Sequence, residues 1–162
     1  RQKGAMISFD PNLRFPLWND KKALHDTGNE FVPMADIEKI SNEELGFITG
    51  ENDIKAALPK LFTGNVKLVI YTCGSEGAYA FTNNAQAFAE SEKVKAVDTT
   101  GAGDGFIGSF LYALKPLNVT AEGLCDLDNA QLERCIAFSN KFCGESVKHQ
   151  GAIDSYRKIE FI

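Results

Sequence analysis

The sequence predicts an α/β layered fold with a mostly parallel sheet. Segments with the pattern of a strand alternate with segments of helical spacing, and one pair of strand-like segments flanks a tight turn. The run VKLVIYT (66–72) is almost continuously apolar, which is typical of a strand covered on both faces. This alternation is the usual pattern of helices packed against a largely parallel sheet.

Four predicted elements precede that run. Residues 5–10 (AMISFD) have the pattern of a short buried strand, and residues 19–32 that of a poor helix interrupted at Gly28. A second strand is expected at 36–41 (DIEKIS), where apolar residues alternate. A short helical segment, 41–50 (SNEELGFITG), follows directly and carries acidic residues in its first turn.

The boundaries of the helical segments are set by capping residues and prolines. Ser41 or Asn42 is expected to cap the segment 41–50, and Gly50 to close it. Residues 51–64 place apolar side chains at helical spacing, although Pro59 can kink such a helix.

The second part of the chain adds a hairpin and two longer helices. Residues 77–82 and 85–90 predict two strands around Asn83-Asn84, and 92–98 (EKVKAVD) predicts a further strand. A glycine-rich loop then leads into a helix with a wide apolar face that Pro116 ends. A long final helix is expected over 129–151.

Composition excludes several classes of function. The 162 residues carry a formal net charge of −5, and Lys and Arg never occur in runs longer than two. Binding to nucleic acid or to an anionic membrane is therefore not expected. No apolar stretch is long enough to span a bilayer.

The cysteines indicate the redox compartment, and the start of the chain bears on whether it is part of a longer protein. The four cysteines form no C-x-x-C pair and there are only two histidines, so neither a zinc cage nor a disulfide framework is expected. Free thiols fit a reducing cytoplasm. The length suits a single domain over 1–162. The opening RQKGAMISFDPN has no initiator Met and begins a strand almost at once, which suggests the C-terminal half of a longer protein.

The stretch DTTGAGDGFIG (98–108) contains two overlapping glycine patterns. Gly103, Gly105 and Gly108 match G-x-G-x-x-G, the dinucleotide-binding pattern. However, the carboxylate of Asp104 would repel a pyrophosphate by about 4 kcal/mol at 4 Å and an effective dielectric of 20. The acids about 20 residues further on also lack a preceding strand. A dinucleotide-dependent oxidoreductase is therefore the weaker interpretation.

Phosphoryl transfer gives the same loop a chemical use. Backbone amides of Gly101, Ala102, Gly103 and Asp104 at a helix N-terminus can receive the charge on a phosphoryl group. Asp104 can accept the proton of the attacking hydroxyl. The alternative is structural: Asp104 as a first-turn acid of the helix, and small residues that allow close packing.

The stretch DTTGAGDGFIGSFL resembles the C-terminal signature of the ribokinase-like (PfkB) carbohydrate kinases. SFDPNLRFPLW is similar to the D-x-N-x-R segment of the fructokinase branch, KISNEELGFITG to the N-x-x-E region, TCGSEGAYAF to the T-x-G-x-x-G segment, and AFSNKFCGESVKHQGA to the closing helix beside adenine. The resemblance implies a three-layer α/β/α fold, with this chain forming the C-terminal part of a PfkB-type kinase domain.

The resemblance also implies roles for individual residues. Asp104 would be the catalytic base, with Gly101, Ala102 and Gly103 as the anion hole. The residues implied at the nucleotide are Thr72, Gly74, Gly77, Asn140 and Ser41. Without the family, the two glycines are equally well explained by a turn between strands, and Asn140 by a solvated helix face. Ser41 stands where many relatives have Asn, which puts the phosphate and metal contacts there in doubt.

Metal and substrate contacts are implied in the same way. Glu44 would orient Mg²⁺ through water, and Asp98 with Thr100 would help form a site for a monovalent cation such as K⁺. Asn12 and Arg14 would bind the substrate, since a guanidinium suits oxyanions. The alternatives are a first-turn acid for Glu44, a turn-former for Asp98, and a surface ion pair for Arg14.

The function that the resemblance implies is transfer of the γ-phosphate of ATP to a sugar hydroxyl, with fructose as the favoured sugar. A kinase of 2-keto-3-deoxygluconate or another sugar is the first alternative, and a nucleotide-binding fragment without catalysis is the second. In relatives the lid often mediates pairing, so a homodimer through a segment outside this chain is expected. The expected location is the cytoplasm.

Overall fold

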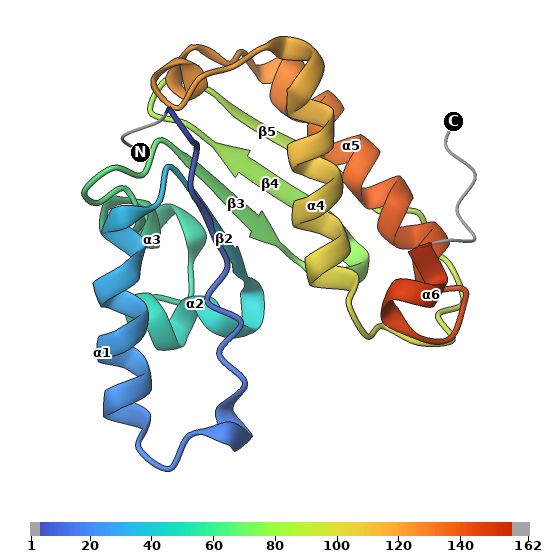
Figure 1. Ribbon diagram of the computed structural model, residues 1–162, viewed down its shortest axis with the longest axis horizontal. Coiled ribbons are helices and arrows are strands. Elements are labelled where there is room, and N and C mark those ends of the chain that lie inside the picture. Colours follow the sequence, from blue (N-terminus) through green and yellow to red (C-terminus); the bar gives the residue numbers. More distant parts are fainter. Residues whose placement is uncertain (1–3, 157–162) are drawn as a thin grey trace.

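The structure, a computed structural model that describes residues 4–156, contains one five-stranded sheet in the order β1-β2-β3-β4-β5 (Figure 1). The strands are β1 (Ser8–Phe9), β2 (Ile37–Ser41), β3 (Leu68–Thr72), β4 (Ala78–Phe81) and β5 (Gln86–Ala89). The first three strands pair in parallel, and β4 pairs antiparallel with β3 and β5. Since only β4 runs against the others, the expected mostly parallel sheet is confirmed.

Helices cover both faces of this sheet. They are α1 (Lys21–Phe31), α2 (Asn42–Thr49), α3 (Ile54–Leu61), α4 (Ala102–Leu114), α5 (Asn129–Ser146) and α6 (Ala152–Tyr156). Figure 1 shows α1, α2 and α3 on one side of the sheet and α4 with α5 on the other. Among residues 4–156, no helix combines the length and the apolar composition that crossing a bilayer requires.

The alternation of side chains along the strands explains the two helical layers. Leu68 and Ile70 of β3 belong to the buried cluster beneath α4 and α5, whereas Val69 belongs to the cluster beneath α1, α2 and α3. Successive side chains of a strand point to opposite faces, so an almost continuous apolar run builds two cores at once. The three-layer α/β/α architecture is therefore confirmed.

Helix α1 runs without interruption through Gly28, contrary to the predicted break. Gly28 is buried, and a Cβ atom at this position would lie 3.1 Å from Cδ1 of Ile48 in α2. The glycine thus allows α1 to approach α2 closely, so packing between the helices outweighs the low helix propensity of glycine. Ser41 caps α2 and Gly50, at φ +74°, closes it, as expected.

The predicted strand over 92–98 is wrong, because this segment leaves the sheet after β5. The amides of Val97 and Asp98 donate to the carbonyl of Val147, at 2.7 Å and 3.2 Å. Their partner therefore lies at the end of α5. Helix α5 ends at Ser146 rather than at residue 151, and the carbonyl of Val147 accepts from residues 97 and 98 instead of continuing the helix. The expected first strand is also shorter, with only Ser8 and Phe9 paired to β2.

Candidate functional site

The glycine-rich loop forms the N-terminus of α4. Gly101 is the N-cap residue at φ +79°, and a Cβ atom there would lie 2.7 Å from Cβ of Ala152 and 2.8 Å from the hydroxyl of Tyr156. Both its backbone conformation and its surroundings therefore require glycine. Asp104 lies in the first turn of α4 and is exposed.

The positions of the glycines contradict the interpretation of this loop as a dinucleotide-binding loop. Gly103, Gly105 and Gly108 all lie inside α4, whereas a dinucleotide fingerprint places its glycines in the turn that leads to the helix. Gly105 serves packing, because a Cβ atom there would lie 3.2 Å from the rings of Phe142 and Tyr156.

A polar pocket of about 320 Å³ opens over the first turn of α4. The residues that line it are Asp10, Asn12, Arg14, Lys39, Thr99, Thr100, Gly101, Ala102, Gly103 and Asp104. Segments that follow β1 and precede α4 thus meet here, near the carboxyl ends of the parallel strands. Ligands of open α/β sheets bind at such an edge.

A second pocket, of about 490 Å³ and more apolar, adjoins the first. Thr99, Ala102 and Gly103 line both pockets, so the loop before α4 forms a shared wall. The second pocket also contains four of the predicted nucleotide-binding residues, namely Thr72, Gly74, Gly77 and Asn140. Ser91 also borders it, and the segment 92–98, which was expected to be a strand, does so through Glu92, Lys93, Val94 and Ala96.

The D-x-N-x-R segment reaches the polar pocket through an unusual backbone. Asn12 and Arg14 both have φ +41°, in the left-handed region that residues with a side chain rarely adopt. Between them, Leu13 is buried in the core beneath α1, α2 and α3. The buried leucine therefore anchors a segment whose flanking residues line the pocket. Backbone strain of this kind is concentrated at ligand sites.

The buried carboxylate of Glu44 holds the D-x-N-x-R segment in place through hydrogen bonds. Its Oε1 accepts a hydrogen bond from the amide of Leu13 at 3.0 Å, and its Oε2 accepts from the amide and the hydroxyl of Ser41, at 3.0 Å and 2.7 Å. Glu44 is only 8% exposed. Within residues 4–156, neither Glu44 nor Ser41 lines either pocket. The hydrogen bonds of these predicted metal and nucleotide residues instead connect α2 to the D-x-N-x-R segment.

Gly74 and Gly77 differ in what their surroundings demand. Gly74, at φ +54°, has open space where a Cβ atom would be. Gly77, at φ +119°, would place a Cβ atom 2.2 Å from the carbonyl oxygen of Ala89. Gly77 is therefore required by the backbone of β5, which supports the turn interpretation for this glycine, whereas Gly74 leaves room beside the pocket.

We expect Gly77→Ala to destabilise the protein more than Gly74→Ala. The backbone conformation alone costs about 1–3 kcal/mol at Gly77, and the contact with Ala89 adds to that cost. At Gly74 the substitution only places a side chain on a left-handed backbone, which costs about 1–2 kcal/mol. Urea unfolding of both variants measures the difference. Equal unfolding midpoints would contradict this expectation, because they would show that β5 shifts away from the new Cβ atom at no cost in stability.

Asn140 is not on a solvated helix face. It is 5% exposed, and its Nδ2 donates to the carbonyl of Ala89 at 2.7 Å. This side chain therefore connects α5 to the end of β5 at the wall of the apolar pocket. The bond uses one of its amide hydrogens, and the amide oxygen remains an acceptor.

Asp98 connects the loop before α4 to the chain after α5. Its Oδ1 accepts from the amide of Thr100 and its Oδ2 from the amide of Gly151, both at 2.9 Å. Hydrogen bonds from Thr100 and Gly151 lower the pKa of Asp98 to about 2. Asp98, Thr100 and the K-H-Q-G-A stretch are thus neighbours, and the turn-forming role of Asp98 is observed directly.

Two residues that sequence analysis did not select hold the first turn of α4. The hydroxyl of Tyr156 donates to the carbonyl of Gly101, and Sγ of Cys143 donates to the carbonyl of Ala102 at 3.2 Å. Burial raises the pKa of Cys143 to about 12 and also raises the pKa of Tyr156, so both stay protonated as donors. They come from α5 and α6, and no local pattern links them to the loop.

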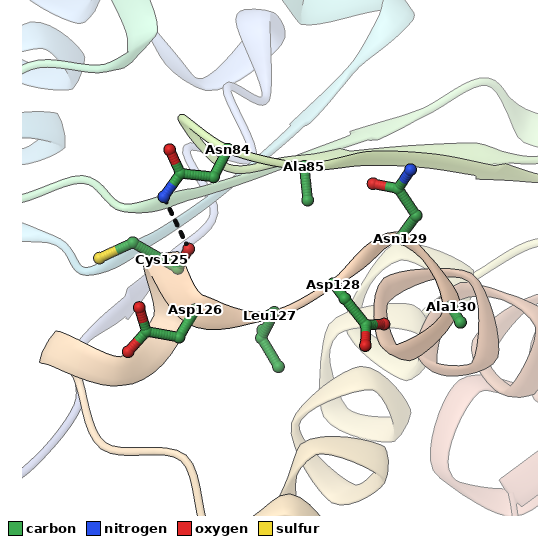
Figure 2. Close-up of a pocket in the computed structure, with 8 residues that line it drawn as sticks. All are labelled: Asn84, Ala85, Cys125, Asp126, Leu127, Asp128, Asn129 and Ala130. Carbon is green, nitrogen blue, oxygen red and sulfur yellow. Dashed lines mark hydrogen bonds between the residues drawn. The ribbon is translucent and has the colours of Figure 1, made fainter.

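Another open cavity, of about 630 Å³, lies beside the turn between β4 and β5 (Figure 2). Figure 2 shows Asn84, in the turn between β4 and β5, donating to the carbonyl of Cys125, at 3.2 Å. The side chain of Asn129 accepts from the amide of Gln86 at 3.1 Å. These bonds connect the hairpin to Cys125, which precedes α5, and to the first residue of α5. This cavity lies at the end of the sheet remote from the loop before α4 (Figure 1).

Known proteins are similar to this chain over nearly its whole length. The model of the pfkB family of carbohydrate kinases matches residues 1–159. The chain is 34% identical over 163 residues to the probable fructokinase-7 of Arabidopsis thaliana, a match that covers 98% of this chain and 46% of that protein.

Residues 4–156 contain no cluster of three or more His, Cys, Asp and Glu side chains able to hold a metal ion.

Solved structures of fructokinases have the same fold. The ATP-bound fructokinase of Xylella fastidiosa matches with a TM-score of 0.86 at 26% identity, over 95% of this chain and 49% of that one. The fructokinase of Vibrio cholerae with fructose, ADP and calcium matches with a TM-score of 0.78 at 34% identity, over 92% and 46%.

The extent of these matches is also informative. The chain spans about half the length of the curated relatives and of the solved structures that it matches. The ribokinase-like fold expected from the sequence is confirmed by the structural matches. Together with the family match over residues 1–159, they show that the chain belongs to the PfkB family of carbohydrate kinases.

Proposed function

We propose that this protein takes part in ATP-dependent phosphorylation of a sugar hydroxyl, with fructose as the acceptor. The observation that supports this most directly is the shared wall between the two pockets. Asp104 and the first turn of α4 face the polar pocket, and the same turn borders the apolar pocket through Ala102 and Gly103. A phosphoryl group between a nucleotide and a sugar would have to lie at such a boundary.

The proposed reaction uses Asp104 as the base. The hydroxyl oxygen of the sugar attacks the γ-phosphorus of ATP, the bond from that phosphorus to the bridging oxygen breaks, and ADP leaves. The hydroxyl proton passes to the carboxylate of Asp104. Asp104 is exposed to the pocket in the first turn of α4, so a bound hydroxyl can reach it.

The amides of Gly103 and Asp104 are the best candidates for the anion hole. They are the second and third residues of α4, and the first amides of a helix have no partner within it. The amide of Ala102, in contrast, already donates to the carbonyl of Thr99 at 3.1 Å. The developing charge would therefore be received mainly by two amides and the positive end of the helix. Gly101 sets their direction as the N-cap residue.

The proposed binding roles divide between the pockets. Thr72, Gly74 and Asn140 would contact the nucleotide in the apolar pocket, and Gly77 would shape its wall. Arg14 and Asn12 would contact the sugar or its phosphate in the polar pocket, and both are exposed there. The guanidinium of Arg14 can donate two hydrogen bonds to one oxyanion.

The residues present fit a magnesium ion that Glu44 reaches only through water, because Glu44 lines neither pocket. Mg²⁺ uses one or two carboxylates and keeps several waters. Glu44 is oriented by its bonds to Leu13 and Ser41, and a carboxylate retains lone pairs for further donors. Oδ1 of Asp10 is buried and has no hydrogen-bond partner among the described residues. When bound, the ion would neutralise charge on the phosphates. Asp98 and Thr100 are proposed only as part of a site for a monovalent cation.

Fructose is favoured because of the named relatives. The proteins from Arabidopsis thaliana, Xylella fastidiosa and Vibrio cholerae are named as fructokinases, and that of Vibrio cholerae was solved with fructose and ADP. The D-x-N-x-R segment in the polar pocket is consistent with this branch. 2-Keto-3-deoxygluconate remains the alternative acceptor.

The proposal is tested by titrating the protein with Mg·ATP in a calorimeter and by assaying ADP release with a panel of sugars. We expect heat from nucleotide binding and ADP release with fructose above that with ribose or 2-keto-3-deoxygluconate. Nucleotide heat without ADP release for any sugar would favour a binding module without catalysis. Absence of nucleotide heat would contradict the proposal.

A further inference from the structure

Lys39 is a buried cation that sequence analysis did not assign to the site. It lies in β2, and its side chain is only 7% exposed. Its Nζ lies 3.0 Å from Oδ2 of Asp10, which directly follows β1. Both residues line the polar pocket that contains Asp104. A lysine is almost never this buried unless it is paired or serves a site.

The ammonium group of Lys39 lies against the first turn of α4. A Cβ atom on Gly103 would be 3.2 Å from Nζ of Lys39. Gly103 is the second residue of α4, and the N-terminus of a helix carries a partial positive charge. A fixed cation beside that end is unfavourable for the helix, and a bound anion would offset the repulsion.

The charges that face the pocket support an anionic ligand. Asp10 and Asp104 are acidic, whereas Arg14 and Lys39 are basic, so these side chains sum to zero. The free amides and the dipole of α4 then add positive potential. Arg14, Lys39 and these amides are therefore the groups that an entering phosphoryl group would bind.

Asp10 holds Lys39 and leaves one of its own oxygens without a partner. Oδ2 pairs with Lys39, while Oδ1 is buried and has no hydrogen-bond partner among residues 4–156. Burial raises the pKa of Asp10, and Lys39 lowers it. A buried acceptor without a donor is costly, and a bound donor such as a metal-bound water or a sugar hydroxyl would satisfy it.

We propose that Lys39, positioned by Asp10, binds an oxygen of the phosphoryl group as it passes from ATP to the sugar. This role rests on the proposed kinase function. The bond to ADP breaks and the bond to the sugar oxygen forms as described above, and the hydroxyl proton still passes to Asp104. The ammonium group of Lys39 donates hydrogen bonds to the phosphoryl oxygens and offsets their charge. Gly103 leaves room for the ammonium group, since a Cβ atom there would lie 3.2 Å from Nζ of Lys39.

The test compares Lys39→Met with the wild-type protein in the binding of Mg·ADP and of Mg·ADP with fluoroaluminate, with and without fructose. Fluoroaluminate resembles the phosphoryl group in transfer. We expect the affinity for Mg·ADP to change by less than about threefold, since Lys39 does not line the apolar pocket. The affinity for the fluoroaluminate complex should fall by about 10–100-fold, as for loss of a hydrogen bond to a charged group.

Lys67→Met is the matched control. Lys67 has a side chain 19% exposed and forms ion pairs with Asp36 and Glu122, at 3.9 Å and 3.5 Å. It directly precedes β3, at the end of that strand remote from the N-terminus of α4. This variant should lose stability without losing affinity for fluoroaluminate. A purely structural role for Lys39 predicts that the two variants behave alike.

A second variant keeps the test valid if Lys39→Met does not fold. Lys39→Gln removes the positive charge but keeps an amide that can donate to Asp10, so the buried carboxylate keeps a hydrogen-bond partner. It should also bind Mg·ADP and fail to bind fluoroaluminate tightly. If the wild type binds fluoroaluminate and both Lys39 variants bind it equally well, the role of Lys39 is overturned alone. If the wild type binds neither ligand, the kinase proposal is overturned with it.

Discussion

Replacing Asp104 with asparagine is expected to lower kcat for sugar phosphorylation by about 10²–10⁴-fold. Asparagine has the same shape and keeps the backbone amides of α4 in place, but it cannot accept the hydroxyl proton. The apolar pocket does not include Asp104, so affinity for ATP should be nearly unchanged. Steady-state kinetics with fructose and calorimetry with Mg·ATP measure the two quantities separately.

Asp126→Asn is the matched control for this experiment. It removes the same formal charge at an exposed aspartate that lines the cavity beside the turn between β4 and β5 (Figure 2). Its kcat should equal that of the wild type. If Asp104→Asn retains a wild-type kcat, Asp104 is not the base, and its position would be explained as a first-turn acid that interacts with the dipole of α4.

Most elements of the fold were predictable because their signals are local. The apolar run at 66–72 contains β3 and the residues of both cores. Ser41 and Gly50 mark the two ends of α2, where capping chemistry acts within a few residues. Pro116 ends α4 as expected, because a 3-10 turn over Lys115–Leu117 follows it.

The errors arose where distant contacts outweigh local pattern. The segment 92–98 alternates like a strand, yet its amides bond to Val147, more than 40 residues away in sequence. Gly28 suggests a helix break, yet contact with Ile48 makes glycine suitable there. In both cases tertiary packing decides the conformation, and a single sequence does not show the partner.

The same distinction applies to the candidate site. The loop around Asp104 is contiguous, so its glycines and its carboxylate could be interpreted together. Lys39 and Tyr156 reach that loop from β2 and α6, and only the folded chain brings them there. One signal was available for Lys39: a lysine inside DIEKIS, a segment otherwise expected to be buried, needs a partner or a ligand.

A second charged residue of β2, Glu38, has no such partner. It is 0% exposed, and neither carboxyl oxygen has a hydrogen-bond partner among the described residues. It aligns with Phe9 of β1 and Val69 of β3, and thus lies on the face covered by α1, α2 and α3, away from the pockets. Burial raises the pKa of Glu38 to about 8.

This shift has a definite sign for stability. Below the ordinary pKa of 4.5, Glu38 is protonated in the folded and the unfolded protein, so it causes no penalty. As the pH rises from 4.5 to 8, only the unfolded state releases the proton, and the free energy of unfolding falls. The loss is on the order of 3 kcal/mol at pH 7. Above pH 8 both states are ionised and the loss levels off.

Glu38→Met is therefore expected to raise the free energy of unfolding at pH 7 by on the order of 3 kcal/mol, and the melting temperature by roughly 5–10 °C. Methionine fills a similar volume and needs no hydrogen bond. Glu38→Gln should gain less, because its amide hydrogens would be buried without acceptors. Glu133→Met, at an exposed position of α5, is the control and should leave the pH dependence unchanged. Urea unfolding at pH 5, 6, 7 and 8 gives the slope. If Glu38→Met retains the slope of the wild type, Glu38 is ionised in the folded protein, and β2 must then hold a compensating charge beside it.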